Sequence, residues 1–271
     1  MPCKSRTAGE AKSIGVAHQK LIRDRRAAED ADIDLFGRWW EGLDLTLSKS
    51  EVREIDHATA KTIIEKYEWL GNMGVMNLNH FGIFFDGHLG GVVVYTVEYI
   101  ENLGKWDSYG FTGKIILLSR GACSHWTPVG TASRLIRRSM KLLPPKYEIV
   151  TCTVDAEAGE IGTIYQACGF YYTGQLSKGG PIMSADVNGK NVSQRHLRRI
   201  YGTRGQKALE NVKDGSISNI KAHARKKRYF AFRGSRSSVK AHRLAIAHLI
   251  KPYPKRGLSI GRTDPIGASL V

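Results

Sequence analysis

Apolar and polar positions fall into blocks along the chain, and the clearest blocks predict β-strands. The segment HFGIFFDGHLGGVVVYTVE, residues 80–98, holds two runs rich in aromatic and β-branched residues on either side of Asp86-Gly87. An Asp-Gly pair between two such runs predicts a tight hairpin, because the turn needs residues that accept a positive φ. A third apolar run, Lys114 to Ser124, predicts a strand that is buried over its first half.

Two longer segments have helical spacing. Residues 54–71 place apolar side chains on about one helical face and end at Gly71, a helix stop. Residues 131–144, TASRLIRRSMKLLP, form a stronger amphipathic pattern that ends at Pro144-Pro145. The apolar positions of the two patterns are Ile55, Ala58, Ile63, Tyr67 and Leu70 in the first, and Leu135, Ile136, Met140 and Leu143 in the second.

A second pair of strand and helix follows directly. The run EIVTCTV, Glu148 to Val154, predicts a strand, and a polar loop leads into a short helix, Ile161 to Cys168, before Gly169. Strand, helix, strand and helix joined by short links require a crossover, so two neighbouring strands must be parallel. The predicted fold class is therefore α/β, with a mixed central sheet flanked by helices.

The composition fits one folded core with extensions. A chain of 271 residues with 42% hydrophobic content can bury a full core. We divide it into an N-terminal arm, 1–50, a core, 51–184, and a basic extension, 185–271, and predict no role for the arm. No run is long enough to span a bilayer and the first residues lack the apolar stretch of a signal peptide, so a soluble intracellular protein without a membrane partner is expected. Four cysteines without CxxC spacing predict neither disulfides nor a zinc ribbon.

Excess positive charge is confined to the last third of the chain. Residues 185–271 hold 20 Lys and Arg against 4 Asp and Glu, whereas the first 184 residues hold 21 of each sign. Such asymmetry is typical of a surface that contacts polyphosphate, although a solvated basic tail gives the same count. Residues 223–236, HARKKRYFAFRGSR, favour nucleic acid because aromatic rings between cations can stack on bases. The cations predicted to bind DNA are Lys226, Lys227, Arg228, Arg233 and Arg236, and the interleaved rings are Tyr229, Phe230 and Phe232.

The loop HWTPVGTAS, between the third strand and its helix, is the predicted binding loop. Its Gly130 and small residues lead into a helix N-terminus, where backbone N–H groups are unpaired. Phosphate is the natural occupant of such a site, and the alternative is a plain turn in which Thr131 or Ser133 caps the helix. The residues predicted to bind the donor are Thr127, Gly130, Thr131 and Ala132.

The order of these elements resembles the GNAT acyltransferase family. Helix, Asp-Gly hairpin, strand, glycine-containing loop, helix and strand are followed by Tyr165 in IYQACGF. The family's pyrophosphate loop reads Gln/Arg-x-x-Gly-x-Gly/Ala. TPVGTA keeps Gly130 and Ala132 but has Thr127 at the first position, where it departs from the pattern that binds acetyl-coenzyme A. The resemblance implies that Tyr165 protonates the departing thiolate.

A closer resemblance is to the Mom-type DNA modification proteins of Mu-like bacteriophages. It is carried by FGIFFDGHLGGVV, LLSRGACSHWTPVGTASRLI, DAEAGEIGTIYQACGFYYTG and KKRYFAF, which lie within residues 54–236. It implies a phage-encoded enzyme of the host cytoplasm that converts adenine in DNA to N6-carbamoylmethyladenine, which protects that DNA from host restriction. By motif, it implies functional roles for Arg120, Ser133, Asp155 and Tyr165.

Each of these four residues has a structural alternative. Arg120 could be an ion-pair partner of Asp155 on the neighbouring strand, although ligands of such sheets bind at the carboxyl ends of strands. Asp155 could cap the next helix, or it could orient Arg120 or the adenine amine. Ser133 could be a first-turn residue or a donor contact, and Tyr165 a core aromatic or an acid.

The implied product constrains the donor. Acetyl transfer would join the adenine nitrogen to a carbonyl carbon, whereas the carbamoylmethyl product joins it to a methylene. Glycyl-tRNA meets this requirement without a redox cofactor, because a transferred glycyl group can rearrange through a spiro intermediate. Acetyl-coenzyme A (acetyl-CoA) with metal or radical assistance is the alternative donor. Iron is the metal to consider for that route, but the sequence has no facial His/carboxylate set for it.

Two other classes of function stay open. The chain could be a GNAT-type acyltransferase for another amine, or a non-catalytic DNA-binding protein on the same scaffold, because a fold does not determine function. The basic last third argues against a small-molecule substrate and predicts DNA as a partner, together with tRNA if glycyl-tRNA is the donor. Adenine must leave the base stack to enter a pocket, and Trp126, Tyr171 and Tyr172 are the candidate rings to stack on it.

Overall fold

The computed structural model describes residues 17–33, 38–74, 77–98, 106, 108–111, 114–176, 182–187, 190–193, 197 and 217–255. Its helices are α2 (His18–Ile33), α3 (His57–Tyr67), α5 (Thr131–Leu142), α6 (Thr163–Ala167) and α9 (Arg236–Ala245), with short 3-10 turns η1 (Leu47–Lys49), η2 (Ala156–Ala158) and η3 (Ala247–Leu249). Its strands are β1 (Glu51–Glu54), β2 (Asn77–Phe85), β3 (His88–Val97), β4 (Lys114–Cys123), β5 (Tyr147–Val154), β6 (Tyr171–Gly174), β7 (Ile182–Val187), β8 (Lys190–Ser193), β9 (Ile217–His223) and β10 (Lys227–Phe232). None of the helices in these ranges is long and apolar enough to cross a bilayer.

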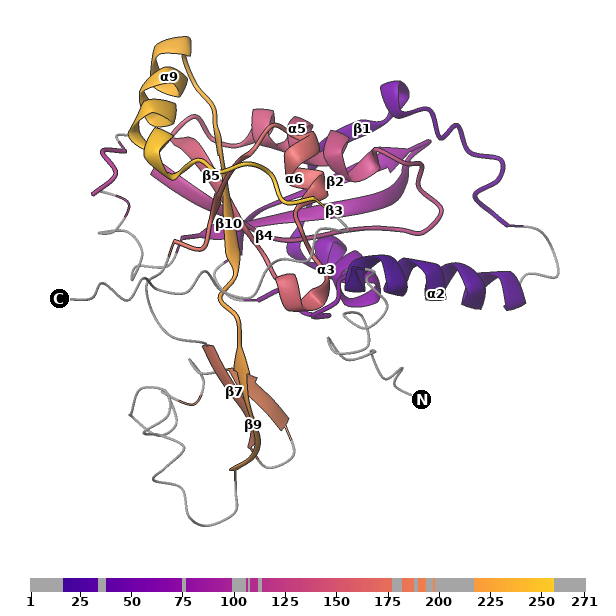
Figure 1. The fold of residues 1–271 in the computed structure, drawn as a ribbon. Coiled ribbons are helices and arrows are strands. Elements are labelled where there is room, and N and C mark those ends of the chain that lie inside the picture. Colours follow the sequence, from indigo (N-terminus) through magenta and orange to yellow (C-terminus); the bar gives the residue numbers. More distant parts are fainter. Residues whose placement is uncertain are drawn as a thin grey trace.

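The main sheet contains seven strands in the order β1-β2-β3-β4-β5-β10-β6 (Figure 1). β4 and β5 are parallel, and the other neighbouring pairs are antiparallel. The predicted α/β class with a mixed sheet is thus confirmed. The parallel pair is the one that the crossover through α5 requires.

Local chemistry sets the boundaries of the first elements. Asp86 and Gly87 both have positive φ, 46° and 81°, as the predicted hairpin turn requires. Asp56 starts α3 by accepting a first-turn backbone N–H at 2.7 Å. Glu68, the residue after α3, accepts two backbone N–H groups of the next turn at 2.8 and 3.1 Å. The helix is therefore shorter at both ends than the apolar spacing predicts.

Alternate residues of β3 face opposite sides of the sheet, and different helices cover them. Val93 and Tyr95 pack in a cluster that includes Leu135 of α5. Val92 and Val94 pack with the buried face of α3. Because both faces of the strand are covered, the sequence of β3 is a continuous apolar run instead of an alternating one. Burial of each such side chain contributes roughly 1.5–3 kcal/mol.

A second sheet, β8-β7-β9, is inserted between β6 and β10 and projects from the main body (Figure 1). We call it the small sheet. β7 crosses the predicted boundary at residue 184, and β10, from the predicted extension, lies between β5 and β6 in the main sheet. The prediction that Tyr229 and Phe230 stack on bases is wrong, since both are fully buried. Tyr172 is also buried, against Tyr229.

Hydrogen bonds connect the small sheet to η2. Glu157 of η2 accepts a hydrogen bond from the backbone N–H of Ala224 at 2.8 Å and lies 2.8 Å from Nδ1 of His223. The other ring nitrogen of His223 lies 2.6 Å from the Ser184 hydroxyl on β7. Two strands of the small sheet are thus connected to the turn that follows β5.

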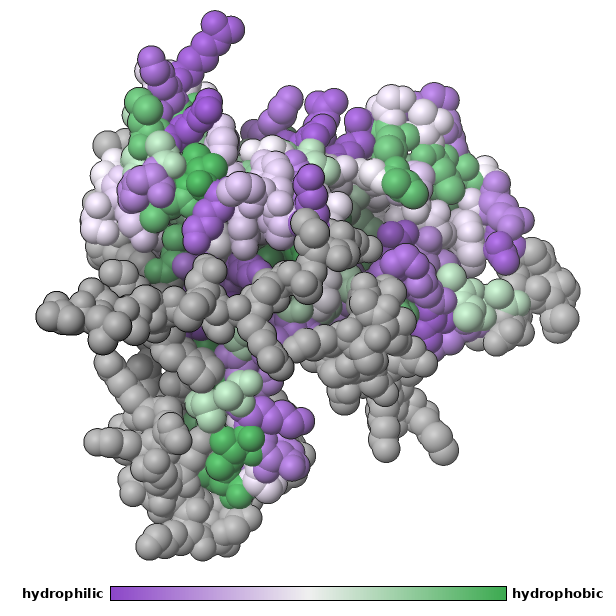
Figure 2. All heavy atoms as spheres, in the orientation of Figure 1, coloured by the Kyte–Doolittle hydropathy of each residue, from purple (hydrophilic) through white to green (hydrophobic). Residues whose placement is uncertain are grey.

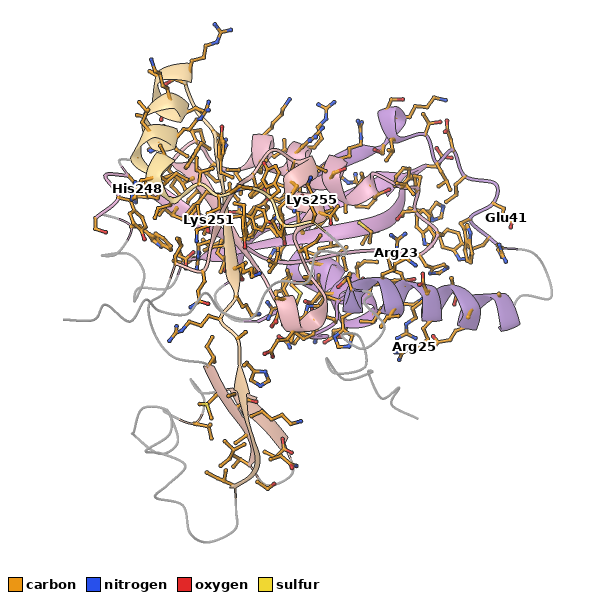
Figure 3. All side chains as sticks on the ribbon, viewed as in Figure 1. Arg23, Arg25, Glu41, His248, Lys251 and Lys255 are labelled. Atoms are coloured by element: carbon orange, nitrogen blue, oxygen red, sulfur yellow. The ribbon has the colours of Figure 1, made fainter. Side chains whose placement is uncertain are left out.

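The chain beyond α9 runs back across the main sheet, from His248 past Lys251 to Lys255 (Figure 3). The hydroxyl of Tyr253 donates to the carbonyl of Phe170 at 2.7 Å. The last described residues are therefore packed against the body that β6 and α6 belong to.

Candidate active site

The pairing of the two parallel strands stops before either strand ends. β4 and β5 are paired only as far as Leu118 and Cys152, although β4 continues to residue 123 and β5 to residue 154. Arg120, on β4, and Asp155, directly after β5, lie beyond the last pair. The carboxyl ends of parallel strands are where open α/β sheets bind ligands.

Arg120 is held by the turn that follows α3. Its Nε donates to the carbonyl of Asn72 at 2.9 Å, and its Nη2 lies 3.3 Å from the side-chain oxygen of that residue. Its Nη1 donates to the carbonyl of Ser119 at 2.8 Å. The ion pair that the structure gives to Asp155 is with Lys226, at 3.8 Å, and not with Arg120. The guanidinium is fixed at the end of β4 as a source of positive charge.

Asp155 has two roles in the structure. Its Oδ1 caps the short turn η2 by accepting the N–H of Glu157 at 3.0 Å, whereas the helix that the sequence predicts after it, α6, begins after Gly162. Its Oδ2 faces Lys226, and its own N–H donates to Oε2 of Glu160 at 3.0 Å. The cap therefore also holds a carboxylate among other charged groups.

Two glutamates that no sequence motif points to, Glu68 and Glu160, lie in the same place. Removal from water raises the pKa of Glu160 to about 7, against the hydrogen bond from Asp155 and the charge of Lys226, while the Asp155 and Glu68 carboxylates add to the shift. Removal from water also raises the pKa of Glu68, against the charges of Arg120 and Lys226. We call Glu68, Arg120, Asp155, Glu160 and Lys226 the charged cluster.

The sequence carries little signal for these two glutamates. Glu68 follows a helical pattern at a position where a charged residue is usually solvated, and Glu160 lies in a polar loop. Burial in the folded chain is the main cause of both raised pKa values, and the charges that act on these groups lie far apart in the chain. Only the distance of Glu160 from Asp155, five residues along one polar loop, could have suggested a carboxylate pair.

Tyr165, on α6, packs against the core within electrostatic reach of the charged cluster. Its ring centroid lies 5.5 Å from that of Phe170 and 5.8 Å from that of Tyr229. Burial raises the pKa of its hydroxyl far above the usual value, and the neighbouring Cys152 and Glu160 add to the shift. At neutral pH the phenol is therefore protonated and can donate a hydrogen bond or a proton.

The cysteines next to this site are protonated thiols. Burial raises the pKa of Cys152 well above its usual value and that of Cys168 to about 11. The thiolate is the nucleophile and the metal ligand, so neither residue is activated for such a role. In the described ranges no group of three or more His, Cys, Asp or Glu side chains is placed to hold a metal ion.

The β4–α5 loop enters α5 through Gly130, whose φ of 95° suits glycine. The hydroxyls of Thr127 and Thr131 donate to carbonyls within the loop at 2.8 and 2.7 Å, and that of Ser133 donates to the Gly130 carbonyl at 2.9 Å. Three N–H groups, those of Gly130, Ala132 and Ser133, have no acceptor in the described part of the chain. They lie at the positive end of α5 and would suit an anion such as phosphate.

Two cations predicted to bind DNA are engaged inside the protein. Nη1 of Arg228 lies 3.1 Å from a carboxylate oxygen of Glu98 and 2.9 Å from the hydroxyl of Thr151. Its guanidinium also covers the ring of Trp106 at 4.8 Å. Arg233 donates to three carbonyls at the end of α5 and the start of β5, at 2.7 to 2.9 Å. Both placements differ from the expected surface contact, because β10 is an interior strand.

The other predicted cations have different surroundings. Lys226 and Arg236 are exposed, and partial burial lowers the pKa of the half-buried Lys227. Hydrophilic side chains gather over α9 and α5 in the view of Figure 2. The exposed cations of these two helices are Arg137, Arg138 and Lys141 on α5, and Arg236, Lys240 and Arg243 on α9.

Solved structures similar to this chain include two acetyltransferases and an N-acyl amino acid synthase. An acetyltransferase of the GNAT family from Bacillus cereus ATCC 10987 has 11% identity and a TM-score of 0.36, over 69% of this chain and 99% of that one. FeeM, an N-acyl amino acid synthase from uncultured soil microbes, has 13% identity and a TM-score of 0.39, over 68% of this chain and 91% of that one. A GNAT family acetyltransferase from Elizabethkingia anophelis, solved with acetyl-CoA bound, has 10% identity and a TM-score of 0.34, over 68% and 98%.

The family model described as the Mom protein family matches residues 49–255. A search of curated proteins gave no match. The matched range includes the charged cluster, the β4–α5 loop, the small sheet and α9. It is also longer at both ends than the range that carries the motifs quoted above, and it covers more than half of the chain. The chain therefore belongs to the Mom protein family, as its motifs predicted.

Proposed function

We propose that this protein converts adenine in DNA to N6-carbamoylmethyladenine by transferring a glycyl group to the exocyclic amine and rearranging it. Membership of the Mom family supports a DNA-modifying reaction. The observation that carries the chemistry is the charged cluster beyond the last β4–β5 pair, where Glu160 has a pKa of about 7. A carboxyl group with that pKa is suited to proton transfer at neutral pH.

Attack by the adenine amine requires a base. The nitrogen lone pair is delocalised into the ring, so the amine becomes a good nucleophile only as its proton is removed. Glu160 accepts this proton while the new bond forms between N6 and the glycyl carbonyl carbon. Asp155 accepts a hydrogen bond from the second N–H of the amine and so orients it. The positive charge of Arg120 stabilises the oxygen of the tetrahedral intermediate.

Departure of the donor requires an acid. Tyr165 is protonated at neutral pH because burial raises its pKa. It gives its proton to the ribose oxygen as the bond between that oxygen and the glycyl carbon breaks. Glu160 and Tyr165 are thus the base and the acid of the same transfer step, within electrostatic reach of each other.

The second stage needs no redox partner. The free glycyl amine attacks C6 of the ring and forms a five-membered spiro intermediate, and the proton that this amine loses passes to the Tyr165 phenolate left by the first stage. The bond between C6 and the original N6 then breaks, and that nitrogen leaves as the carboxamide, which gives adenine-NH-CH2-CO-NH2. Glu160, protonated in the first stage, returns its proton to the departing nitrogen.

The β4–α5 loop is the proposed donor site. The N–H groups of Gly130, Ala132 and Ser133 would hold a phosphate of the donor, and Thr127 and Thr131 would maintain the turn. Both glycyl-tRNA and acetyl-CoA carry such phosphates. The methylene in the product favours the glycyl donor, because acetyl transfer cannot form it without a further oxidation of the methyl carbon.

DNA is proposed to lie on the exposed cations of α5, α9 and Lys226, since these can neutralise backbone phosphates. The target adenine must be flipped out to reach the charged cluster. Trp126, partly exposed and in edge contact with Trp39 at 5.5 Å, and Tyr171, partly exposed and stacked on Phe232, are the rings proposed to stack on it.

Mass spectrometry of nucleosides tests the function. Plasmid DNA from cells that express the chain, grown with and without isotopically labelled glycine, should contain labelled N6-carbamoylmethyladenosine as its deoxynucleoside. An unlabelled adduct would keep the DNA-modifying function and replace the glycyl donor with acetyl-CoA or another source. If the protein is well expressed and the DNA contains no adduct, the function is that of a DNA-binding protein or of a transferase for another amine.

A further inference from the structure

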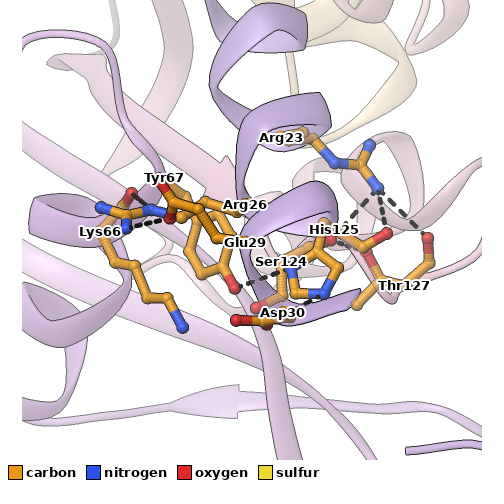
Figure 4. Close-up of polar contacts among 9 residues, drawn as sticks. All are labelled: Arg23, Arg26, Glu29, Asp30, Lys66, Tyr67, Ser124, His125 and Thr127. Atoms are coloured by element: carbon orange, nitrogen blue, oxygen red, sulfur yellow. Dashed lines mark hydrogen bonds and ion pairs between the residues drawn. The ribbon is translucent and has the colours of Figure 1, made fainter. Parts of the chain in front are cut away.

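The helix α2 lies before the range matched by the family model, which begins at residue 49. The sequence pattern of this arm predicts no role for it. In the structure α2 contacts α3 and reaches the start of the β4–α5 loop, where its polar side chains meet the loop backbone (Figure 4).

Arg23 of α2 binds the carbonyl side of that loop. Its Nη2 lies within hydrogen-bond distance of three carbonyl oxygens (Figure 4). They belong to Ser124 at 3.1 Å, His125 at 3.2 Å and Thr127 at 3.3 Å. The C=O and N–H of a trans peptide unit point in opposite directions, so the N–H groups of His125 and Trp126 point away from Arg23. Neither N–H has an acceptor in the described ranges.

His125 ties the same loop to two helices. Its Nδ1 lies 3.0 Å from the hydroxyl of Tyr67 on α3, and its Nε2 lies 3.2 Å from Oδ2 of Asp30 on α2. Burial lowers the pKa of His125, against the charge of Asp30, so the ring is neutral at neutral pH. A neutral ring that accepts from Tyr67 at Nδ1 has its hydrogen on Nε2, toward Asp30.

The arrangement carries a cost in stability. Nε of Arg23 is buried without an acceptor among the described residues, and Nε2 of His125 makes no hydrogen bond of good geometry. Buried donors without acceptors are unfavourable. Proteins retain buried donors without acceptors mostly where function requires them.

We infer that Arg23 is a positioning residue of the donor site. It holds the carbonyl oxygens of the β4–α5 loop on the side of α2, so that the free N–H groups of the loop face the phosphate-bearing donor. The inference rests on the proposed function for the identity of the ligand, while the contact between Arg23 and the loop stands on the geometry alone.

Amide hydrogen exchange on the full chain tests the contact without any substrate. In R23A the amides of residues 124–133 should exchange faster than in the wild type, by about tenfold, because three loop carbonyls lose their shared donor, Nη2 of Arg23. The control is K20A on the same helix, which removes only an exposed ion pair with Asp24. Unchanged exchange in R23A, or the same increase in K20A, would overturn the inference. If R23A releases α2 altogether, R23K replaces it, and the loop must exchange faster while α2 stays protected.

Steady-state kinetics test the role in donor binding. We expect R23A to raise the KM for the donor that supports turnover, glycyl-tRNA or acetyl-CoA, by roughly 10- to 100-fold, with the KM for DNA unchanged and R23K in between. A loss confined to kcat, or shared equally by both substrates, contradicts donor positioning. If the wild type modifies no adenine with either donor, the proposed function fails, and the exchange experiment alone still decides whether Arg23 holds the loop.

Discussion

Nζ of Lys226 lies 3.8 Å from the carboxylate of Asp155, although the whole small sheet separates the two residues in sequence. The contact joins the residue before β10 to the residue after β5. The same ammonium group lies 5.8 Å from the ring of Trp69, beyond the end of α3. A cation that the sequence assigns to DNA binding thus also sets the electrostatics of the charged cluster.

Replacement of Lys226 should change the pH profile of the reaction. The positive charge of Lys226 lowers the pKa of Glu160, so K226Q should raise that pKa and move the rise in rate to higher pH. Burial is the main cause of the raised pKa of Glu160, and the charged groups that act on it are Lys226, which lowers it, and Asp155 and Glu68, which raise it. The matched control is R236Q, an exposed cation on α9. Rates measured between pH 5 and pH 9 test this prediction. Identical midpoints in K226Q and the wild type would show that Lys226 does not affect the pKa of Glu160.

Glu160 should be essential for turnover. E160Q keeps an oxygen for the N–H of Asp155 but cannot accept a proton, so the rate should fall by roughly 10²- to 10⁴-fold. E65Q, an exposed glutamate of α3 paired with Lys61, serves as the control and should keep the wild-type rate. The measurement is the initial rate of adenine modification with DNA and donor in excess. A wild-type rate in E160Q would assign the base to another residue.

The same substitution should alter the dependence of stability on pH. The pKa of Glu160 is about 7 in the folded protein against an ordinary value of 4.5. Between these values the folded state binds the proton more tightly than the unfolded state, so the free energy of unfolding falls as pH rises from about 4.5 to about 7. The free energy of unfolding of E160Q lacks this fall, so E160Q should become more stable relative to the wild type as pH rises from about 4.5 to about 7. Urea midpoints at pH 4 and pH 8 measure it, and a difference that is the same at both would contradict the raised pKa.

Tyr165 should contribute through its hydroxyl and not its ring. Y165F keeps the packing against Phe170 and Tyr229 and removes the proton donor, so kcat should fall by roughly 100-fold while DNA affinity and thermal stability stay near wild type. Y253F removes a hydroxyl that donates to the Phe170 carbonyl nearby and should leave kcat unchanged. Equal rates in Y165F and the wild type would leave Tyr165 as a core aromatic.

The basic residues should separate into two groups by phenotype. R236Q and K240Q, on the exposed face of α9, should weaken DNA binding and reduce the slope of log K against log salt by about 0.9 each. R228M should instead destabilise the fold by about 3–5 kcal/mol, because it removes the cation from a buried ion pair with Glu98. Anisotropy titrations at several salt concentrations and thermal melts measure the two effects. A stable R228M with weakened DNA binding would return Arg228 to the interface.

The fold could be predicted from the sequence where the signal is local. Asp86-Gly87 determines its hairpin by backbone chemistry, and the spacing of Leu135 and Ile136 determines the buried face of α5. The position of β10 has no such signal. The run KRYFAF suits either an exposed basic strand or an interior one, and the choice depends on its insertion between β5 and β6.

The site divides in the same way. Arg120, Asp155 and Tyr165 could be proposed as site residues because motifs carry them, and the structure places two of them beyond the last paired residues of the two parallel strands. Glu68 and Glu160 could not, because their raised pKa values follow from burial in the folded protein, which no local sequence motif encodes. The contact of Arg23 with the loop is likewise tertiary, since about a hundred residues separate its partners in sequence.

The small sheet leaves the main sheet after Gly174 and returns at Arg228, and these two residues are paired neighbours on β6 and β10. The insertion therefore starts and ends at neighbouring positions of the main sheet. An exchange of the segment for a longer, shorter or differently charged one would leave the register of the seven strands intact. Such an exchange would also leave Arg120, Asp155 and Tyr165 in place, because all three precede Gly174 in the chain.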